Sequence, residues 1–202
     1  KRTECLTVLI CRRLGLPRLQ SFPVQDLTQE QRAVYELVPR SAARTEVHGP
    51  VLAMLLEPEL ATRTEHISLF FKKSKRFERR LRELAILVTA RSWTCHYEWY
   101  AHAGAAVEHG LSPDVVEAIR MGQEPHFDRD DEEIVYSVTK AIQDEKSLPD
   151  DLYERARTTF TEAGVTELLA ITGYYTYLAM LIAGFELEPP HQVPNPLPVL
   201  AT

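Results

Sequence analysis

Three residue types that can move protons or act as nucleophiles lie close together between positions 95 and 102, in the stretch WTCHYEWYAH. Each residue of a helix advances about 100° around the axis, so Cys95, Glu98 and His102 fall within an arc of roughly 60° on one helical face. His102 can gain or lose a proton near neutral pH. Cys95 would lie in the first turn, where the helix dipole favours a thiolate. The spacing therefore predicts a helix that presents a proton-transfer site.

Two carboxylates can assist that site. Glu98 precedes His102 by four residues, so their side chains can hydrogen-bond directly. Glu83 lies in the preceding helical segment, and it reaches the same place if the two helices pack antiparallel. Because Leu84 and Ala85 follow Glu83, we expect an apolar setting that raises the pKa of its carboxyl and makes it an acid at pH 7.

The same residues also have purely structural interpretations. A buried cysteine commonly packs as a small hydrophobic residue, and a Glu–His pair four residues apart commonly lies on a helix surface. Zinc could use these donor types, but the chain has no H-E-x-x-H motif and no paired C-x-x-C, so no metal is expected. We expect His109 to cap the carboxyl end of its helix.

Local signals place several helices around this segment. Thr28 and Gln31 form a capping-box pattern, Pro50 and Pro58 suit first helical positions, and Ser112 suits an N-cap. A further helix is expected to stop at Gly164. The expected helices cover 28–38, a short segment from 50, 58–73, 77–91, 95–109, 112–122, 130–145, 149–164 and 165–187.

The composition fits one all-α domain. The chain has 202 residues, of which 45% are hydrophobic and 26% charged, and it shows no regular succession of short alternating strands. We expect an irregular N-terminal extension over residues 1–27, a helical domain over 28–186 and a proline-rich extended tail over 187–202.

Charge and cysteine content limit the partners. The net charge of −6 argues against nucleic acid, and we expect the basic run over residues 72–82 to be solvated. Three cysteines without regular spacing indicate no disulfide framework, which favours a reducing, cytoplasmic location. The uncharged segment 168–185 is near the lower length limit for a membrane span, and we interpret it as a core helix that could also form a subunit contact.

The stretch from Glu83 to Gly110 resembles the core of the carboxymuconolactone decarboxylase family, which includes the alkyl hydroperoxidase D-like proteins. Their pattern is Glu, eleven residues, Cys, two residues, Cys, three residues, His, and a later Gly. Glu83, Cys95, His102 and Gly110 match this pattern, whereas Glu98 stands at the second cysteine position. The resemblance implies an alkyl hydroperoxidase D-like helical bundle, a homo-oligomer (trimer or hexamer) and no cofactor. The phrase YEWYAH is similar to a subgroup that mostly lacks the cysteine pair.

The resemblance implies two activities. A decarboxylase, or lyase, would use Glu83, Glu98 and His102 as acid–base residues on a small organic acid or lactone. An alkyl hydroperoxidase, with peroxiredoxin-type activity, would use Cys95 as the thiol and Glu83 with His102 as the proton relay. Glu98 cannot form a disulfide, so that enzyme would need an external thiol, and its charge would raise the pKa of Cys95. A non-catalytic oligomeric binding protein is the third possibility.

Overall fold

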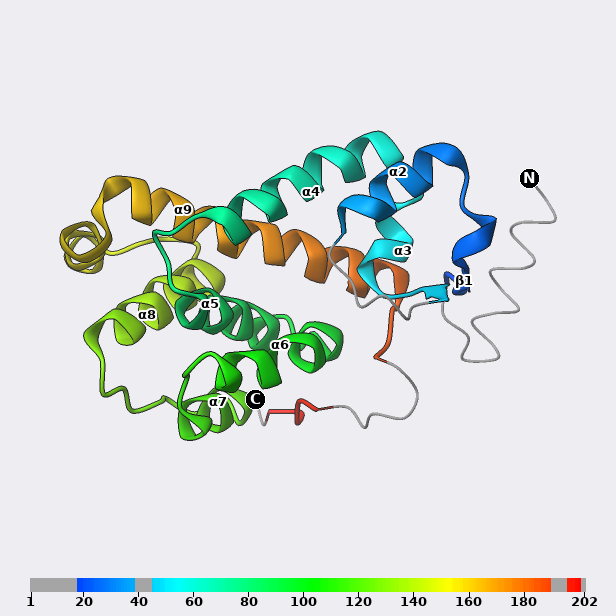
Figure 1. Ribbon diagram of the computed structural model, residues 1–202. Coiled ribbons are helices and arrows are strands. Elements are labelled where there is room, and N and C mark those ends of the chain that lie inside the picture. Colours follow the sequence, from blue (N-terminus) through cyan, green and yellow to red (C-terminus); the bar gives the residue numbers. More distant parts are fainter. Residues whose placement is uncertain (1–17, 39–44, 190–195, 201–202) are drawn as a thin grey trace. The chain divides into compact units, whose positions relative to one another are not determined.

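The computed structural model describes residues 18–38, 45–189 and 196–200, and the described part is mainly helical (Figure 1). The only strands among these residues are β1 (Phe22–Pro23) and β2 (Glu46–Val47), which pair antiparallel. The all-α class expected from the sequence is therefore confirmed. Cys5 and Cys11, most of the expected N-terminal extension and much of the proline-rich tail lie outside the described residues.

The chain forms two compact units. The first contains the described residues up to Phe70 together with Met180–Glu188, and the second contains Phe71–Ala179 together with the described residues from Pro189 onward. The first unit includes the 3-10 helix η1 (Val24–Asp26), α2 (Gln29–Leu37), α3 (Pro50–Met54) and nearly all of α4 (Pro58–Lys73). Both halves of the capping box expected at Thr28 and Gln31 are present at the start of α2.

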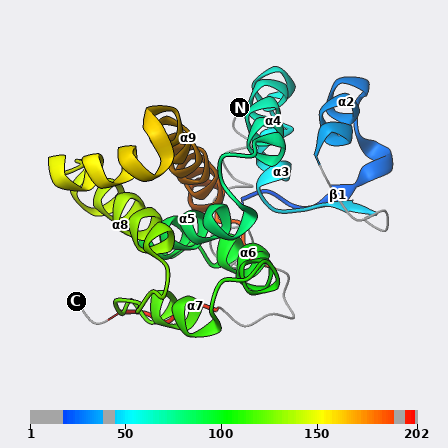
Figure 2. The same cartoon turned by 60° about the vertical axis from the view of Figure 1, so that its left-hand side comes forward.

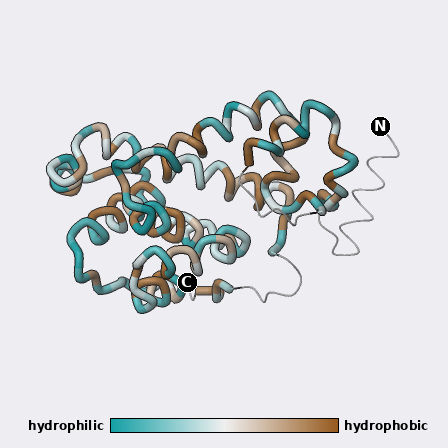
Figure 3. Tube along the Cα trace, in the orientation of Figure 1, coloured by the Kyte–Doolittle hydropathy of each residue, from teal (hydrophilic) through white to brown (hydrophobic). Residues whose placement is uncertain are grey.

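The second unit is built around α5 (Arg79–Ser92), which packs against α6 (His96–Glu108), α7 (Pro113–Arg120) and α8 (Asp130–Glu145). All but four residues of α5 are buried, because neighbours cover it on several sides. Figure 3 shows hydrophilic and hydrophobic stretches mixed along these helices. Residues with no exposed surface at the centre of this unit include Leu84, Leu87, Val135, Val138 and Leu168.

A buried cation fixes α5 to α8. Arg80 is 3% exposed, and its guanidinium contacts the carboxylates of both Asp131 and Glu132. Arg82 donates hydrogen bonds to main-chain carbonyls of the segment that precedes α5, including that of Phe71 at 2.7 Å. The expectation that the basic run 72–82 is wholly solvated is therefore wrong, since two of its arginines hold the fold together.

The last helix, α9 (Asp150–Phe185), contains a break at Thr161, where φ is 65° and ψ is 167°. Figure 2 shows its first, yellow turns running in a different direction from the rest. The sequence-based expectation of a stop at Gly164 is wrong by three residues, because Gly164 stays helical and the left-handed residue is a threonine.

Among the described helices, α9 alone is long and apolar enough to cross a membrane, with 39% of its most apolar window buried. The apolar core helix of a globular protein meets the same criterion.

Candidate functional site

A tight reversal between α5 and α6 brings the two site helices together. Trp93 ends α5, and Thr94 takes the left-handed conformation with φ at 48°. The Cys95 N–H then donates to the carbonyl of Ala90 at 2.8 Å, and Cys95 becomes the N-cap of α6. This reversal gives the antiparallel packing that the sequence analysis required for Glu83 to reach the residues of α6.

Glu83 and His102 form the central contact of the site. The Nδ1 atom of His102 lies 2.7 Å from Oε2 of Glu83. The other carboxylate oxygen of Glu83, Oε1, accepts a hydrogen bond from Nε of Arg79 at 3.1 Å. The Glu83 side chain is 6% exposed and that of His102 is 23% exposed, so the imidazole is the more accessible member of the pair.

The charge state of Glu83 differs from the sequence-based expectation. Burial acts to raise the pKa of this carboxyl, but the hydrogen bond and charge of His102, followed by those of Arg79, outweigh it and leave the pKa lowered. Glu83 is therefore a carboxylate at neutral pH, and the expectation of a raised pKa at this residue is wrong. A carboxylate accepts hydrogen bonds only, so Nδ1 of His102 carries the hydrogen and Nε2 is left as the basic nitrogen.

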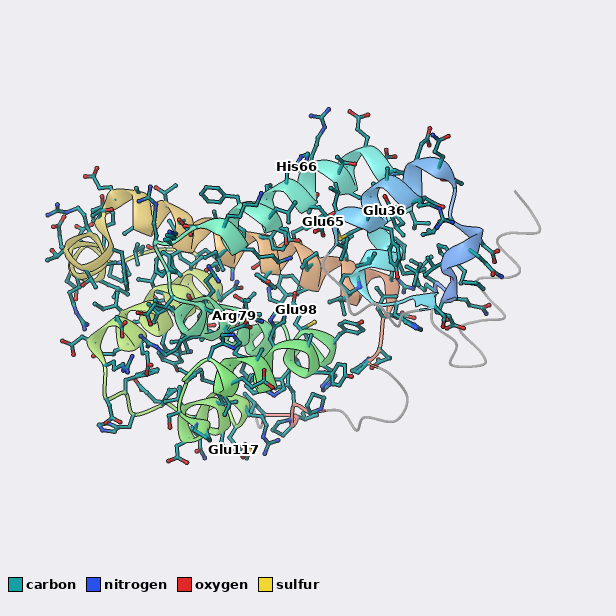
Figure 4. All side chains as sticks on the ribbon, viewed as in Figure 1. Glu36, Glu65, His66, Arg79, Glu98 and Glu117 are labelled. Carbon is teal, nitrogen blue, oxygen red and sulfur yellow. The ribbon has the colours of Figure 1, made fainter. Side chains whose placement is uncertain are left out.

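Glu98 supplies the neutral acid instead. It is 3% exposed, and neither carboxyl oxygen has a hydrogen-bond partner among the described residues. Burial raises its pKa to about 8. The direct hydrogen bond that the spacing of Glu98 and His102 allows is not formed, and His102 instead contacts Glu83 on the neighbouring helix through Nδ1. Figure 4 marks Glu98 on α6 and Arg79 at the start of α5.

Cys95 directly precedes the first turn of α6, which carries Glu98. The residue is buried, at 6% exposed, and occupies the N-cap position at the positive end of α6, without a side-chain capping hydrogen bond. We expected a negative charge on Glu98 to raise the pKa of the thiol. A pKa of about 8 leaves Glu98 mostly uncharged at pH 7, which removes that electrostatic argument.

Two residues of the site were missed in the sequence analysis. Tyr175 of α9 packs edge-on against the imidazole of His102, with ring centroids 5.3 Å apart and an angle of 89° between the planes. Burial, together with the charges of nearby groups that include Glu83 and Glu98, raises the pKa of Tyr175, so its phenol stays protonated. Arg79 could have been found from its i, i+4 spacing to Glu83. No local signal relates position 175 to position 102.

His109 takes a structural role, and the described residues hold no cluster suited to a metal ion. Nδ1 of His109 lies 2.8 Å from the carbonyl of Ala105 in its own helix, which supports the expected capping role. The types and placement of the site residues suit proton transfer. A carboxylate orients a histidine, a second carboxyl holds a proton on the same helix, and a cysteine lies at the helix start.

Residues 58–132 match the carboxymuconolactone decarboxylase family, which belongs to the alkyl hydroperoxidase D-like superfamily. The matched segment contains Glu83, Cys95, Glu98 and His102. This match confirms the resemblance over the segment that it covers, and the helical structure agrees with the fold that the resemblance implies. No curated protein matches the chain.

Proposed function

We propose that this chain, whose residues 58–132 match the carboxymuconolactone decarboxylase family, is a cofactor-independent acid–base enzyme that acts on a small organic acid or lactone. The observation that carries the proposal is the 2.7 Å contact between Nδ1 of His102 and the carboxylate of Glu83. The family match supports the general class, and the protonation states of the site residues support acid–base chemistry within it.

Two carboxyl groups in opposite states are what such chemistry needs. The pKa of Glu83 is lowered by its contacts with His102 and Arg79, whereas burial without a partner raises the pKa of Glu98 to about 8. At neutral pH the site therefore contains an anion that orients the imidazole and a neutral acid one helical turn from that imidazole. Pairs of titratable groups whose environments push their pKa values apart identify the acid and the base.

A decarboxylation would use these groups in order. The substrate carboxylate leaves as carbon dioxide, and the electron pair of the broken carbon–carbon bond passes into the conjugated system of the lactone. Glu98 donates its proton to the carbanionic product. His102, whose Nε2 is the basic nitrogen, takes up a proton from solvent, and this proton returns to Glu98 through water because the two side chains are not hydrogen-bonded. One proton is consumed in each cycle, which balances the replacement of a carboxylate by hydrogen.

Release of carbon dioxide from 4-carboxymuconolactone and related lactone acids tests the proposal. The wild type is expected to turn over one of them, and His102→Gln to lower kcat by about 10²–10⁴-fold. His109→Gln is the matched control, because His109 lies on the same helix but bonds within it. Turnover retained in both His102→Gln and Glu83→Gln would eliminate the proposal.

A thiol peroxidase that uses Cys95 is the second candidate. It is supported by the position of Cys95 at the N-cap of α6 and by the largely neutral state of Glu98. The thiolate would attack the peroxide O–O bond, giving a sulfenic acid and water or an alcohol. An external thiol would then reduce the sulfenic acid in two steps. Sulfenic acid at Cys95 after brief peroxide treatment supports this candidate, and peroxide consumption unchanged in Cys95→Ser excludes it. A chain with neither activity would be a binding protein.

A second copy of the chain is the proposed macromolecular partner, in a reducing cytoplasmic setting. Leu56, Leu60 and Ile67, spaced by four and seven residues, are 55%, 50% and 48% exposed and form an apolar stripe along α4 and the turn before it. Such a stripe suits packing against the same stripe of a second subunit. The double variant Leu60→Glu, Ile67→Glu is expected to dissociate the oligomer, which lowers the molecular mass measured by light scattering. Met121→Glu, which changes an exposed residue elsewhere, is expected to leave it unchanged.

A further inference from the structure

The second compact unit contains a cavity that is separate from the Glu83–His102 site. It has a volume of about 590 Å³, within the range of small-molecule sites. Its walls come from the last turns of α5, the end of α7, the middle of α8 and residues 199–200 of the C-terminal segment. None of the four residues assigned to proton transfer lines it.

Arg91 is the notable charge in this cavity. One of its terminal nitrogens, Nη1, donates to the carbonyls of Pro198 and Arg120, and the other, Nη2, donates to the hydroxyl of Thr94. The Nε atom is buried and has no hydrogen-bond partner among the described residues. All of the partners that Arg91 does have are neutral oxygens.

A partly buried guanidinium without a carboxylate is unusual, because burying a charge is costly unless an opposite charge compensates it. The described residues place no carboxylate within ion-pair distance of Arg91, and burial lowers its pKa. The other cation of the cavity, Lys140, already contacts Asp144. Among the residues that line the cavity, Arg91 would therefore give an incoming anion the most favourable electrostatic interaction.

The rest of the wall limits the shape and charge of a ligand. Val88, Ile119 and Leu200 supply apolar surface. Asp144 and Glu124 also line the cavity and would repel a second negative charge. The Leu200 side chain lies so close to Gly122 that a Cβ there would come within 2.4 Å of it, so this wall has no space for a larger residue.

The C-terminal wall is held in place by specific contacts. Leu197 is 4% exposed, and the carbonyls of Pro196 and Pro198 accept hydrogen bonds from Arg120 and Arg91, each at 3.1 Å. Arg120 holds the segment from outside the cavity, whereas Arg91 both holds the segment and lines the cavity.

We propose that this cavity binds a small monocarboxylate with an apolar body, with the carboxylate against the guanidinium of Arg91 and the body against Val88, Ile119 and Leu200. The ligand occupies a second site, independent of the Glu83–His102 contact. No proton-transfer residue lines the cavity, so the bound acid is not a substrate there and would act as a regulator.

Benzoate and its neutral isostere benzamide test the assignment by calorimetry, with nitrogen–proton NMR to locate the contact. Benzoate is expected to shift the amide signals of Ser92 and Gln123, and to bind at least tenfold more tightly than benzamide, because an ionic hydrogen bond is stronger than a neutral one. Arg91→Gln is expected to weaken benzoate binding by at least tenfold, while Arg91→Lys keeps part of it.

Arg120→Gln is the matched control, because it removes an equivalent hydrogen bond to the C-terminal segment without removing the cavity's cation. It is expected to retain benzoate binding, as is His102→Gln. Equal affinity of wild type and Arg91→Gln for benzoate would overturn the proposal. Equal affinity for benzoate and benzamide, or signal changes confined to the surroundings of His102, would overturn it as well.

Discussion

Nδ1 of His102 lies 2.7 Å from Oε2 of Glu83, which joins α6 to α5 through side chains that are 19 positions apart in the sequence. The contact leaves Nε2 of the imidazole as the basic nitrogen, and Arg79 holds the second carboxylate oxygen of Glu83. The orientation of the histidine is thus set by a buried anion on a neighbouring helix, and this fixed orientation is what the proposed activity requires.

Replacing Glu83 by Gln is expected to lower kcat by about 10²–10⁴-fold. The amide nitrogen of Gln can donate to Nδ1, which favours the tautomer whose hydrogen lies on Nε2 and removes the basic nitrogen from the accessible side. Turnover of the lactone acid measures the loss, and nitrogen NMR of the imidazole reports the tautomer. Glu154→Gln, at an exposed ion pair, should behave as the wild type. An unchanged kcat in Glu83→Gln would contradict the orienting role.

Glu98 is expected to make the folded protein less stable as the pH rises. The folded pKa of about 8 lies above the ordinary value of 4.5, so the folded state binds this proton more strongly than the unfolded state. The stabilisation is complete below 4.5 and is lost as the pH rises through 8. The full effect on the free energy of unfolding is on the order of 5 kcal/mol.

Urea unfolding at several pH values between 5 and 9 measures this dependence. Glu98→Gln cannot ionise, so its free energy of unfolding should fall less over that range than that of the wild type. The difference between the two proteins is the quantity of interest, because other groups titrate equally in both. Parallel stability curves would show that Glu98 has an ordinary pKa.

Cys95→Ser is expected to keep the lactone-acid activity within about twofold, since serine is a good N-cap residue and the acid–base groups are untouched. The same variant decides the peroxidase alternative, because loss of peroxide consumption would assign that activity to the thiol. Full loss of decarboxylation in Cys95→Ser would contradict the proposed roles of Glu98 and His102.

Arg80→Met is expected to reduce the free energy of unfolding by about 3–5 kcal/mol, because it leaves the buried carboxylate of Glu132 without its compensating charge. Chemical denaturation measures the loss. Arg157→Met, at an exposed pair with Glu154, is the control and should leave stability unchanged. If the two variants had the same free energy of unfolding, the contact of Arg80 with Asp131 and Glu132 would not be a major source of stability.

Much of the fold could be predicted because its signals are local. Caps at Thr28 and Ser112 and prolines at 50 and 58 mark helix starts that the structure reproduces. The break in α9 was missed because it falls on Thr161, a residue type that gives no signal for the left-handed conformation.

The site was harder to predict than its helices. Spacing on one helix grouped Cys95, Glu98 and His102, and antiparallel packing added Glu83. The partner choice of His102 and the protonation of Glu98 depend on which side chains bury each group. Tyr175, which packs against His102, lies more than 70 positions further along the sequence. Such contacts follow from tertiary packing, which helical periodicity does not specify.

Carbon NMR of the glutamate carboxyl groups, titrated from pH 4 to pH 10, tests the central claim most directly. The resonances are assigned with Glu83→Gln and Glu98→Gln. We predict that Glu98 titrates near pH 8, whereas the pKa of Glu83 lies below its ordinary value of 4.5, so that Glu83 remains ionised over most of the titration. A Glu98 signal that titrates near 4.5, or a Glu83 signal that still carries its proton at pH 7, would contradict the account.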